Sequence, residues 1–222
     1  MGNSVGSLGQ LTKHEQDILV GTILGDAHVR QLKTEARVEI THSVKQKEYL
    51  FWKYQQLKRW CNKEPYSVSI NDVRYHKRWY SWRFNTFSHP AFTGLRNLFY
   101  RGTVKIVPQT ITQILKSPLS LAVWYMDDGG RRNDSYGVFL NTLSFTRREH
   151  EYLRRCLKTN FKINSRIHWI QDGYRLYIPS SEAEIFSSLI YPYIVDTLKY
   201  KLSYNPVTTS FARLDRARDR SF

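Results

Sequence analysis

The sequence predicts an α+β fold made of two pseudo-symmetric repeats, each with the element order αββαββα. The first observation behind this prediction is a pair of apolar segments, 18–26 and 119–128, that both end at acidic residues. The second is that the same succession of helix-start signals and strand patterns follows each segment, which indicates an internal repeat. We expect the two apolar helices to form a shared interface, with two antiparallel sheets forming a saddle. The repeats are expected at residues 11–108 and 109–204, between a disordered N-terminus at 1–10 and a basic C-terminal tail at 205–222.

The first repeat contains the signals for three helices and four strands. A capping box of Thr12 and Glu15, in which each side chain bonds the other residue's backbone, starts the apolar helix. Val38 and Ile40 alternate with polar residues, so one face of their strand is expected in the core. The expected strands are 29–31, 37–41, 66–71 and 79–85, and the other helices are expected to be capped by Ser43, as part of a second capping box, and by Ser88.

The second repeat follows the same plan. Ser117 and Pro118, a capping residue and a first-turn proline, start the second apolar helix. Thr146 and Glu149 form another capping box, and a Tyr-Leu pair follows it as one follows Ser43. The expected strands are 136–145, 166–170 and 174–178, and a last helix is expected to be capped by Ser181. Each repeat then ends in a lysine-containing segment, at 101–108 and at 198–202.

The charge of the chain predicts a polyanionic partner. Its 222 residues include 34 Lys and Arg against 19 Asp and Glu, which gives a formal net charge of +15. A surplus of this size favours nucleic acid as the partner. No apolar run approaches the length of a membrane span and no signal peptide is visible, so we expect an intracellular protein without a membrane partner. Cys61 and Cys156 are isolated and are expected to be reduced thiols.

Carboxylates at the ends of the two apolar helices indicate a metal ion. Asp26 follows the first helix, and Asp127 and Asp128 end the second. A carboxylate is disfavoured at the negative end of a helix dipole, and it is costly in an apolar surrounding unless a cation pairs with it. A bound metal ion would remove both penalties.

Small residues on the first helix indicate close packing of the two apolar helices. Gly21 and Gly25 are four residues apart and therefore lie on one side of the helix. We expect this bare strip to lie against Ala122 and Met126 of the second helix. Such packing would make the acids at the two helix ends neighbours.

The two segments resemble the paired motifs of the LAGLIDADG homing endonucleases, in the single-chain form that carries both motif copies. Aligned without gaps, Gly25 falls on Asp127 and Asp26 falls on Asp128. Both copies keep the acid at the eighth motif position, whereas Gly25 and Met126 depart from the family consensus. The resemblance extends over nearly the whole chain, from about Leu11 to Tyr204.

This resemblance implies a metal centre between the two motif helices. Asp26 and Asp128 would bind the metal directly, and the backbone carbonyls of Gly25 and Asp127 would be further ligands. Mg²⁺ is the implied ion because it prefers oxygen ligands, and it would serve as a Lewis acid on the phosphate. Mn²⁺ would substitute for it, and Ca²⁺ would bind without supporting cleavage. The alternative, in which Asp128 only ends its helix, remains open.

The resemblance also implies a basic residue late in each repeat, near the attacking water. Lys105 and Lys201 occupy these places, and Lys199 is a competitor for the second. By resemblance, they would orient the water and stabilise charge at the phosphate. The alternative, that they are surface lysines that bind DNA phosphates, also remains open.

The exposed faces of the two sheets are expected to read DNA. A two-stranded ribbon fits the major groove, where Arg, Lys, Asn and Gln side chains reach the base edges. The candidates are Arg30, Gln31, Lys33, Arg37, Glu39, Ser69, Asn71, Arg74, His76, Lys77, Ser81, Arg83 and Asn85 in the first repeat, and Arg131, Arg132, Asn133, Asn141, Arg166, His168, Gln171 and Arg175 in the second.

The function that the resemblance implies is intron homing by a monomeric, Mg²⁺-dependent endonuclease. It would cut both strands of a long, asymmetric DNA site across the minor groove and leave 3′ overhangs. One alternative is an RNA maturase that assists the splicing of its intron, and another is a non-cleaving DNA-binding regulator of the same fold. An organellar location, in a chloroplast or mitochondrion, is expected because members of this family are often encoded by organellar introns.

Overall fold

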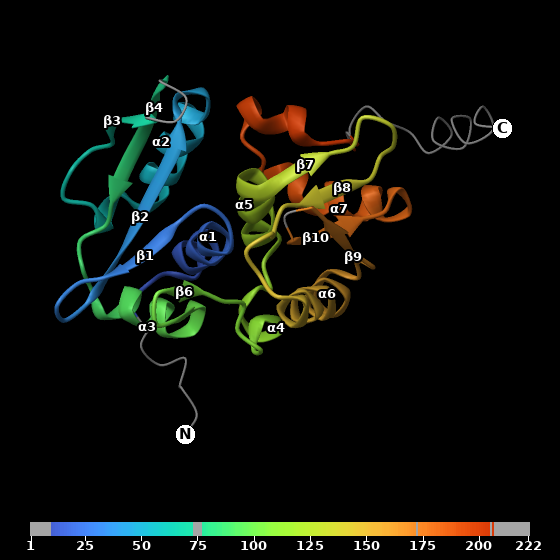
Figure 1. Cartoon of the computed structure of the whole chain (residues 1–222), viewed down its shortest axis with the longest axis horizontal. Coiled ribbons are helices and arrows are strands. Elements are labelled where there is room, and N and C mark those ends of the chain that lie inside the picture. Colours follow the sequence, from blue (N-terminus) through green and yellow to red (C-terminus); the bar gives the residue numbers. More distant parts are fainter. Residues whose placement is uncertain (1–9, 73–76, 172, 205, 207–222) are drawn as a thin grey trace.

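The computed structural model describes residues 10–72, 77–171, 173–204 and 206, and it has two repeats of the same order side by side (Figure 1). The predicted α+β fold with two αββαββα repeats is confirmed. The first repeat consists of α1 (Lys13–Leu24), β1 (His28–Gln31), β2 (Ala36–Ser43), α2 (Lys47–Leu57), β3 (Tyr66–Asp72), β4 (Lys77–Asn85) and α3 (Pro90–Phe99). The second consists of α5 (Pro118–Asp128), β7 (Gly129–Arg131), β8 (Val138–Leu140), α6 (Arg147–Phe161), β9 (Arg166–Ile170), β10 (Gly173–Ile178) and α7 (Ala183–Ile190).

Short elements join and extend the repeats. A small hairpin of β5 (Tyr100–Arg101) and β6 (Val104–Lys105) and the single-turn helix α4 (Ile111–Ile114) connect α3 to α5. In the described residues, the 3₁₀ segments η2 (Val44–Gln46), η3 (Lys58–Trp60), η4 (Ser180–Glu182) and η5 (Tyr191–Tyr193) adjoin α-helices, and η6 (Asp196–Lys201) follows η5. These connections matter because β6 and η6 carry the two lysines of the site described below.

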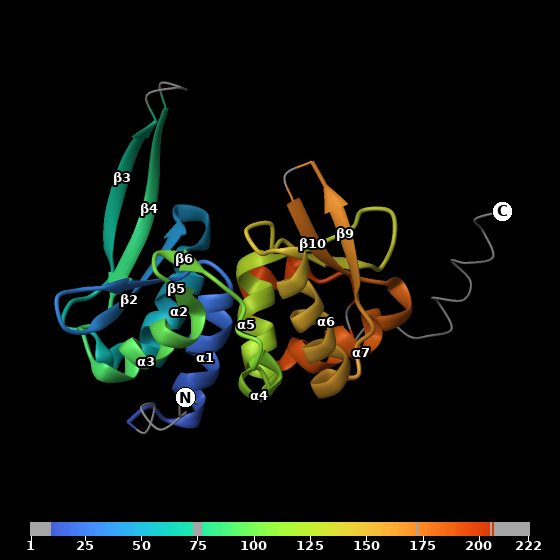
Figure 2. The ribbon, with the colours of Figure 1, turned by 60° about the horizontal axis from the view of Figure 1, so that its bottom comes forward.

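The two four-stranded sheets have equivalent strand orders, β1-β2-β4-β3 and β7-β8-β10-β9, and all their strand pairs are antiparallel. The hairpins β3–β4 and β9–β10 stand on either side of the molecule, with the helices between and below them (Figure 2). One face of each sheet is in the core. Val38 and Ile40 of β2 and Leu176 and Ile178 of β10 are all 0% exposed, as strand alternation requires.

Helices α1 and α5 lie against each other at the centre of the molecule, as predicted (Figures 1 and 2). A Cβ atom on Gly21 would lie 2.4 Å from the Ser120 carbonyl oxygen and 2.7 Å from Cβ of Val123. A Cβ atom on Gly25 would lie 2.4 Å from Cβ of Asp127. The bare strip therefore faces Ser120, Val123 and Asp127, and the expectation that it faces Ala122 and Met126 is wrong.

Some helix starts differ from the prediction. The capping boxes at Thr12 and Thr146 and the Ser117 cap are formed. Ser43 and Ser181 make no capping bond, because a 3₁₀ turn precedes α2 and α7 instead. Helix α3 is capped by His89, whose ring accepts from the Ala91 N–H, and not by Ser88. The caps that were predicted correctly are those with a matched glutamate or a following proline.

Two further sequence predictions can be compared with the fold. In place of the long strand expected at 136–145, the structure has only the short strand β8. The strand β7, which directly follows α5, forms the edge of the sheet next to β8. Neither cysteine forms a disulfide. No helix in the described part of the chain has the length and apolarity that a bilayer span needs.

Candidate active site

The two motif acids lie at neighbouring helix ends. Asp26 directly follows Gly25, the C-cap of α1, and Asp128 is the last residue of α5. Burial, together with the charges of Asp26 and Asp127, raises the pKa of Asp128 to about 8. Burial and the Asp127 carboxylate also raise the pKa of Asp26. The carboxylates therefore repel one another at this place, and a bound cation would relieve that repulsion.

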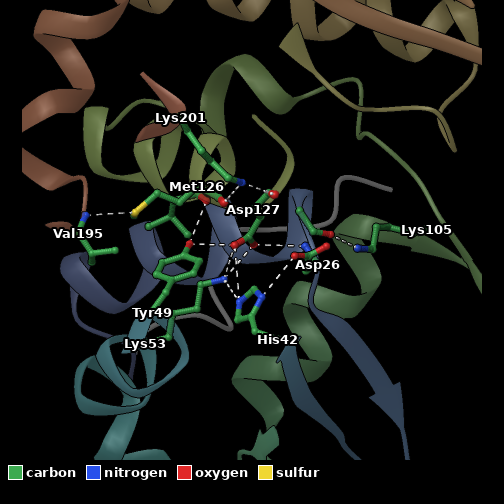
Figure 3. A network of polar contacts seen from close by, with 11 residues as sticks. Asp26, His42, Tyr49, Lys53, Lys105, Met126, Asp127, Val195 and Lys201 are labelled. Carbon is green, nitrogen blue, oxygen red and sulfur yellow. Dashed lines mark hydrogen bonds and ion pairs between the residues drawn. The ribbon is translucent and has the colours of Figure 1, made fainter. Parts of the chain in front are cut away.

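Lys105 and Lys201 reach the motif backbones from equivalent positions in the two repeats. Nζ of Lys105 donates to the Gly25 carbonyl at 2.7 Å, and Nζ of Lys201 donates to the Met126 and Asp127 carbonyls at 2.6 and 3.2 Å (Figure 3). Burial lowers the pKa of both lysines, although the three nearby carboxylates act in the opposite direction. Lys199 instead pairs with Asp196 at 2.6 Å, so Lys201 is the lysine that reaches the site.

The donor set fits a hard divalent cation. Asp26 and Asp128 offer carboxylate oxygens, and in the described residues no side chain hydrogen bonds to the Asp128 carboxylate. The Gly25 and Asp127 carbonyls each accept a lysine and keep a second lone pair. Oxygen ligands of this kind suit Mg²⁺.

The side chain of Asp127 forms a buried polar network that the sequence analysis missed. Its carboxylate accepts from Nζ of Lys53 at 2.6 and 2.9 Å, from the Tyr49 hydroxyl at 2.8 Å and from the Asp26 N–H at 3.2 Å (Figure 3). The imidazole of His42 lies between Lys53 and Asp26. Burial, helped by the Lys53 charge, lowers the pKa of His42 to about 3, so the ring is neutral. Lys53 could have been noticed because it is four residues after Tyr49, on the apolar side of α2.

Some of the DNA-reading candidates lie on the sheet faces that point away from the core. In the first sheet the register pairs Arg30 with Arg37 and Glu39 with Asn85, so these side chains share a face. Ser81 and Arg83 follow on the same face of β4, in alternate positions. Glu39 forms ion pairs with Arg37 at 2.6 Å and with Arg30 at 3.6 Å. Gln31 and Lys33 are exposed at the adjoining turn.

The outer face of the second sheet carries a different set of side chains. Arg175 is paired with His168, and Arg166 is paired with Tyr177 on the same face. The Arg175 guanidinium stacks 3.6 Å from the centre of the Phe139 ring. The exposed or half-exposed candidates beside this sheet are Arg131, Arg132, Asn133, Asn141 and Gln171.

The remaining candidates lie elsewhere. The register pairs Ser69 with Tyr80 and Asn71 with Arg78, which puts Ser69 and Asn71 on the opposite face of the hairpin from Ser81. Arg74 and His76 lie outside the described residues, and Lys77 is the first residue of β4. The structure thus brings together the alternating candidates of β2 and β4 but separates the two on β3 from them.

Two pseudo-symmetric repeats, a shared helix pair with an acid at each end, and two sheets with basic outer faces together define the class of two-motif DNA endonucleases. The sequence profile of the LAGLIDADG DNA endonuclease family matches residues 16–186. The chain belongs to this family.

Individual relatives agree with this assignment. The chain is 31% identical over 210 residues to "DNA endonuclease I-ChuI" of Chlamydomonas applanata, an alignment that covers 87% of this chain and 96% of that protein. It is 30% identical over 198 residues to "Cytochrome b mRNA maturase bI2" of Debaryomyces hansenii, covering 86% of this chain and 74% of that protein. Its fold matches the solved structure of the homing endonuclease I-WcaI bound to its DNA recognition sequence, with a TM-score of 0.80 and 28% identity over 92% of this chain and 96% of that one.

Proposed function

We propose that this protein is a monomeric, site-specific endonuclease that cuts both strands of a long DNA target and promotes the homing of its own intron. One observation carries the proposal: the interface of α1 and α5 brings Asp26 and Asp128 to the same end of the helix pair, with a lysine from each repeat beside them. A carboxylate and a lysine from each repeat, in pseudo-symmetric positions, would match the two phosphodiester bonds of a double-strand cut.

The DNA would lie across the saddle formed by the two sheets. The net charge of +15 supports phosphate binding, and the polar outer faces of the sheets support base recognition. The two faces differ, because the first presents Arg37, Glu39 and Asn85 where the second presents Arg175 stacked on Phe139. Unequal faces support an asymmetric target. The relative solved with its DNA recognition sequence covers nearly this whole chain and supports the same mode of binding.

Asp26 and Asp128 would hold the metal, with the Gly25 and Asp127 carbonyls as further ligands. When bound, Mg²⁺ would supply Lewis-acid assistance at the scissile phosphate and neutralise the crowded carboxylates. Lys105 and Lys201 would orient water and stabilise negative charge at the phosphate. Mn²⁺ would replace Mg²⁺, whereas Ca²⁺ would bind without supporting cleavage. The cut would cross the minor groove and leave 3′ overhangs.

A second function, assistance to RNA splicing, is favoured by one specific observation. A maturase of cytochrome b messenger RNA is among the relatives that match across most of this chain. Intron RNA is therefore a further partner that we propose, and an organellar intron, chloroplast or mitochondrial, is the proposed location of the gene. Maturase activity does not require the two acids and can coexist with cleavage.

The test uses purified protein and a library of long randomised duplexes, with and without Mg²⁺. The wild type is expected to cut a discrete set of duplexes on both strands only when the metal is present. The matched control is the Asp26→Asn, Asp128→Asn double variant, which is expected to bind the same duplexes without cutting them. Selective binding by the wild type without any cut would contradict the proposal and favour a regulator, and binding only to the intron RNA would favour a maturase.

A further inference from the structure

A buried lysine fixes the orientation of the imidazole next to Asp26. The side chains of Lys53 and Asp127 are 0% exposed and that of His42 is 1% exposed. The Nζ atom of Lys53 contacts the two carboxylate oxygens of Asp127 and lies 3.1 Å from Nε2 of His42. An ammonium group has three hydrogens to donate and no lone pair, and these three acceptors use all of its hydrogens.

The tautomer of His42 follows from this contact. Because Lys53 can only donate, Nε2 of His42 must be the acceptor, and the proton of the neutral ring must then be on Nδ1. Nδ1 lies 3.5 Å from Oδ2 of Asp26 (Figure 3). The N–H group of the ring faces this carboxylate, whose side chain is 42% exposed, and the Gln46 side chain is a further hydrogen-bond partner of the ring. In addition, the backbone N–H of Asp26 donates to Asp127 at 3.2 Å.

This triad is not itself a metal site. Ligand atoms of Asp26, His42 and Asp127 lie within 4.8 Å of one another. However, the Asp127 carboxylate already accepts four hydrogen bonds, and the one bare nitrogen of His42 accepts from Lys53. A cation between them would displace a buried ammonium group. The arrangement instead suits contacts that orient Asp26, namely the facing Nδ1 of His42 at 3.5 Å and the bond from the Asp26 N–H to Asp127 at 3.2 Å.

This network, which joins His42 and Lys53 of the first repeat to Asp127 of the second, has no polar counterpart around Asp128 in the part of the chain that the structure describes. When the helix caps Ser43 and Thr146 are aligned, Phe145 corresponds to His42 and Cys156 corresponds to Lys53. When the two motifs are aligned, Gly25 corresponds to Asp127. In the described residues the Asp128 carboxylate accordingly has no side-chain hydrogen-bond donor. One motif acid is therefore supported by a buried network and the other is not.

We propose that His42 is a positioning residue for Asp26, held in its Nδ1–H tautomer by the Lys53–Asp127 pair, and that the two halves of the centre are consequently unequal. The consequence of this inference rests on the proposed nuclease function. It is that cleavage of the DNA strand served by Asp26 depends on His42, whereas cleavage of the other strand does not. The tautomer itself does not depend on that function.

The first test is nuclear magnetic resonance of the protein without metal or DNA. Two-bond nitrogen–proton correlations of the ring are expected to show His42 protonated at Nδ1 only. His150 is the internal reference, because its Nδ1 donates to the Thr146 carbonyl at 2.8 Å within α6 of the second repeat. Lys53→Met is expected to abolish the fixed tautomer of His42 and leave that of His150 unchanged. A wild-type His42 protonated at Nε2, or at both nitrogens, would overturn the proposal.

The second test measures the cleavage of each strand separately on a target that the wild type cuts. His42→Phe, which puts the residue of the second repeat at this place, is expected to slow the cleavage of one strand by about 10- to 100-fold and of the other by less than about twofold. The reason is that the cleavage rate depends steeply on the position of the reacting groups, and His42 positions only the acid that serves one strand. The product that accumulates is then a duplex nicked always in the same strand. His150→Phe, which removes another buried histidine, is the matched control and is expected to keep the ratio of the two rates.

Two amide variants separate positioning from packing. His42→Asn puts an N–H group near the place of Nδ1 and is expected to restore most of the slowed rate, whereas His42→Gln puts its amide near Nε2 and is expected to restore little. Equal slowing of both strands in His42→Phe, or equal rescue by the two amides, would overturn the proposal. Because the wild type cuts both strands in the same assay, a failure of this inference is distinct from a failure of the proposed function.

Discussion

Replacing Lys53 by methionine is expected to lower the free energy of unfolding by about 3–5 kcal/mol, because the variant leaves a carboxylate buried without its cation. The side chains of Lys53 and Asp127 are both 0% exposed, and Nζ lies 2.6 and 2.9 Å from the two carboxylate oxygens. Methionine keeps most of the lysine's aliphatic volume, so the loss measures the charge and its hydrogen bonds rather than a cavity. In a domain of this size, such a loss corresponds to a fall in melting temperature of about 6–20 °C.

The assay is urea unfolding of four proteins: wild type, Lys53→Met, Asp127→Asn and the double variant. Asparagine removes the charge of Asp127 but keeps one oxygen, which at the place of Oδ1 still accepts from the Tyr49 hydroxyl, whereas the bond from the Asp26 N–H to Oδ2 is lost. The double variant is therefore expected to be more stable than Lys53→Met alone, with a coupling of at least about 2 kcal/mol between the two sites. Arg154→Met, which breaks an exposed i,i+3 pair with Glu151, is the control and is expected to cost less than about 0.5 kcal/mol.

Two results would refute this reasoning. A loss below about 1 kcal/mol for Lys53→Met would mean that water or a rearranged side chain replaces the lysine. If Lys53→Met lowered the free energy of unfolding by the same amount in the Asp127→Asn background as in the wild type, the two charges would not interact.

Three further predictions concern packing, acid and metal. Gly21→Ala is expected to destabilise the protein by about 1–3 kcal/mol, because its Cβ would lie 2.4 Å from the Ser120 carbonyl oxygen. Gly130→Ala, whose Cβ meets its first neighbouring atom at 4.0 Å, is the packing control in the same urea experiment. Burial alone would raise the pKa of Glu15, but hydrogen bonds from Arg59, Thr12 and Trp60 lower it from 4.5 to about 2. The stability that this carboxylate contributes is thus present above pH 4.5 and is lost as the pH falls toward 2, so the advantage of wild type over Glu15→Gln in thermal melts should disappear across that range. Mg²⁺ is expected to raise the melting temperature of the wild type by mass action, and a similar rise in the Asp26→Asn, Asp128→Asn variant would place the metal elsewhere.

Local signals predicted the parts of the fold whose determinants are close together in the sequence. The Thr12–Glu15 and Thr146–Glu149 boxes formed because each contains both of its partners within one helical turn. A lone serine before a helix is weaker, because a 3₁₀ turn or a histidine can satisfy the same N–H groups, as at Ser43 and Ser88. The motif acids and the lysines were found through the family resemblance, which is itself a sequence signal.

Register and long-range contacts could not be predicted. Whether Ser69 shares a face with Ser81 depends on the strand register of β3 and β4, and the pairing of residue 69 with residue 80 reverses the expected face. The buried network joins Lys53 of α2 to Asp127 of α5, which are 74 residues apart and belong to different repeats. A lysine and an aspartate in a sequence are most often exposed, and only tertiary packing reveals that these two are paired and buried.

The most direct test of the central claim, that Asp26 and Asp128 form one metal-dependent centre, is cleavage of the selected target by the two single variants, with DNA binding measured in parallel. Asp26→Asn and Asp128→Asn are each expected to abolish the double-strand cut, with a loss of at least about 100-fold, and to bind the target within about threefold of the wild type. A wild-type rate of double-strand cleavage in either variant, or cleavage by the wild type without a divalent cation, would contradict the claim.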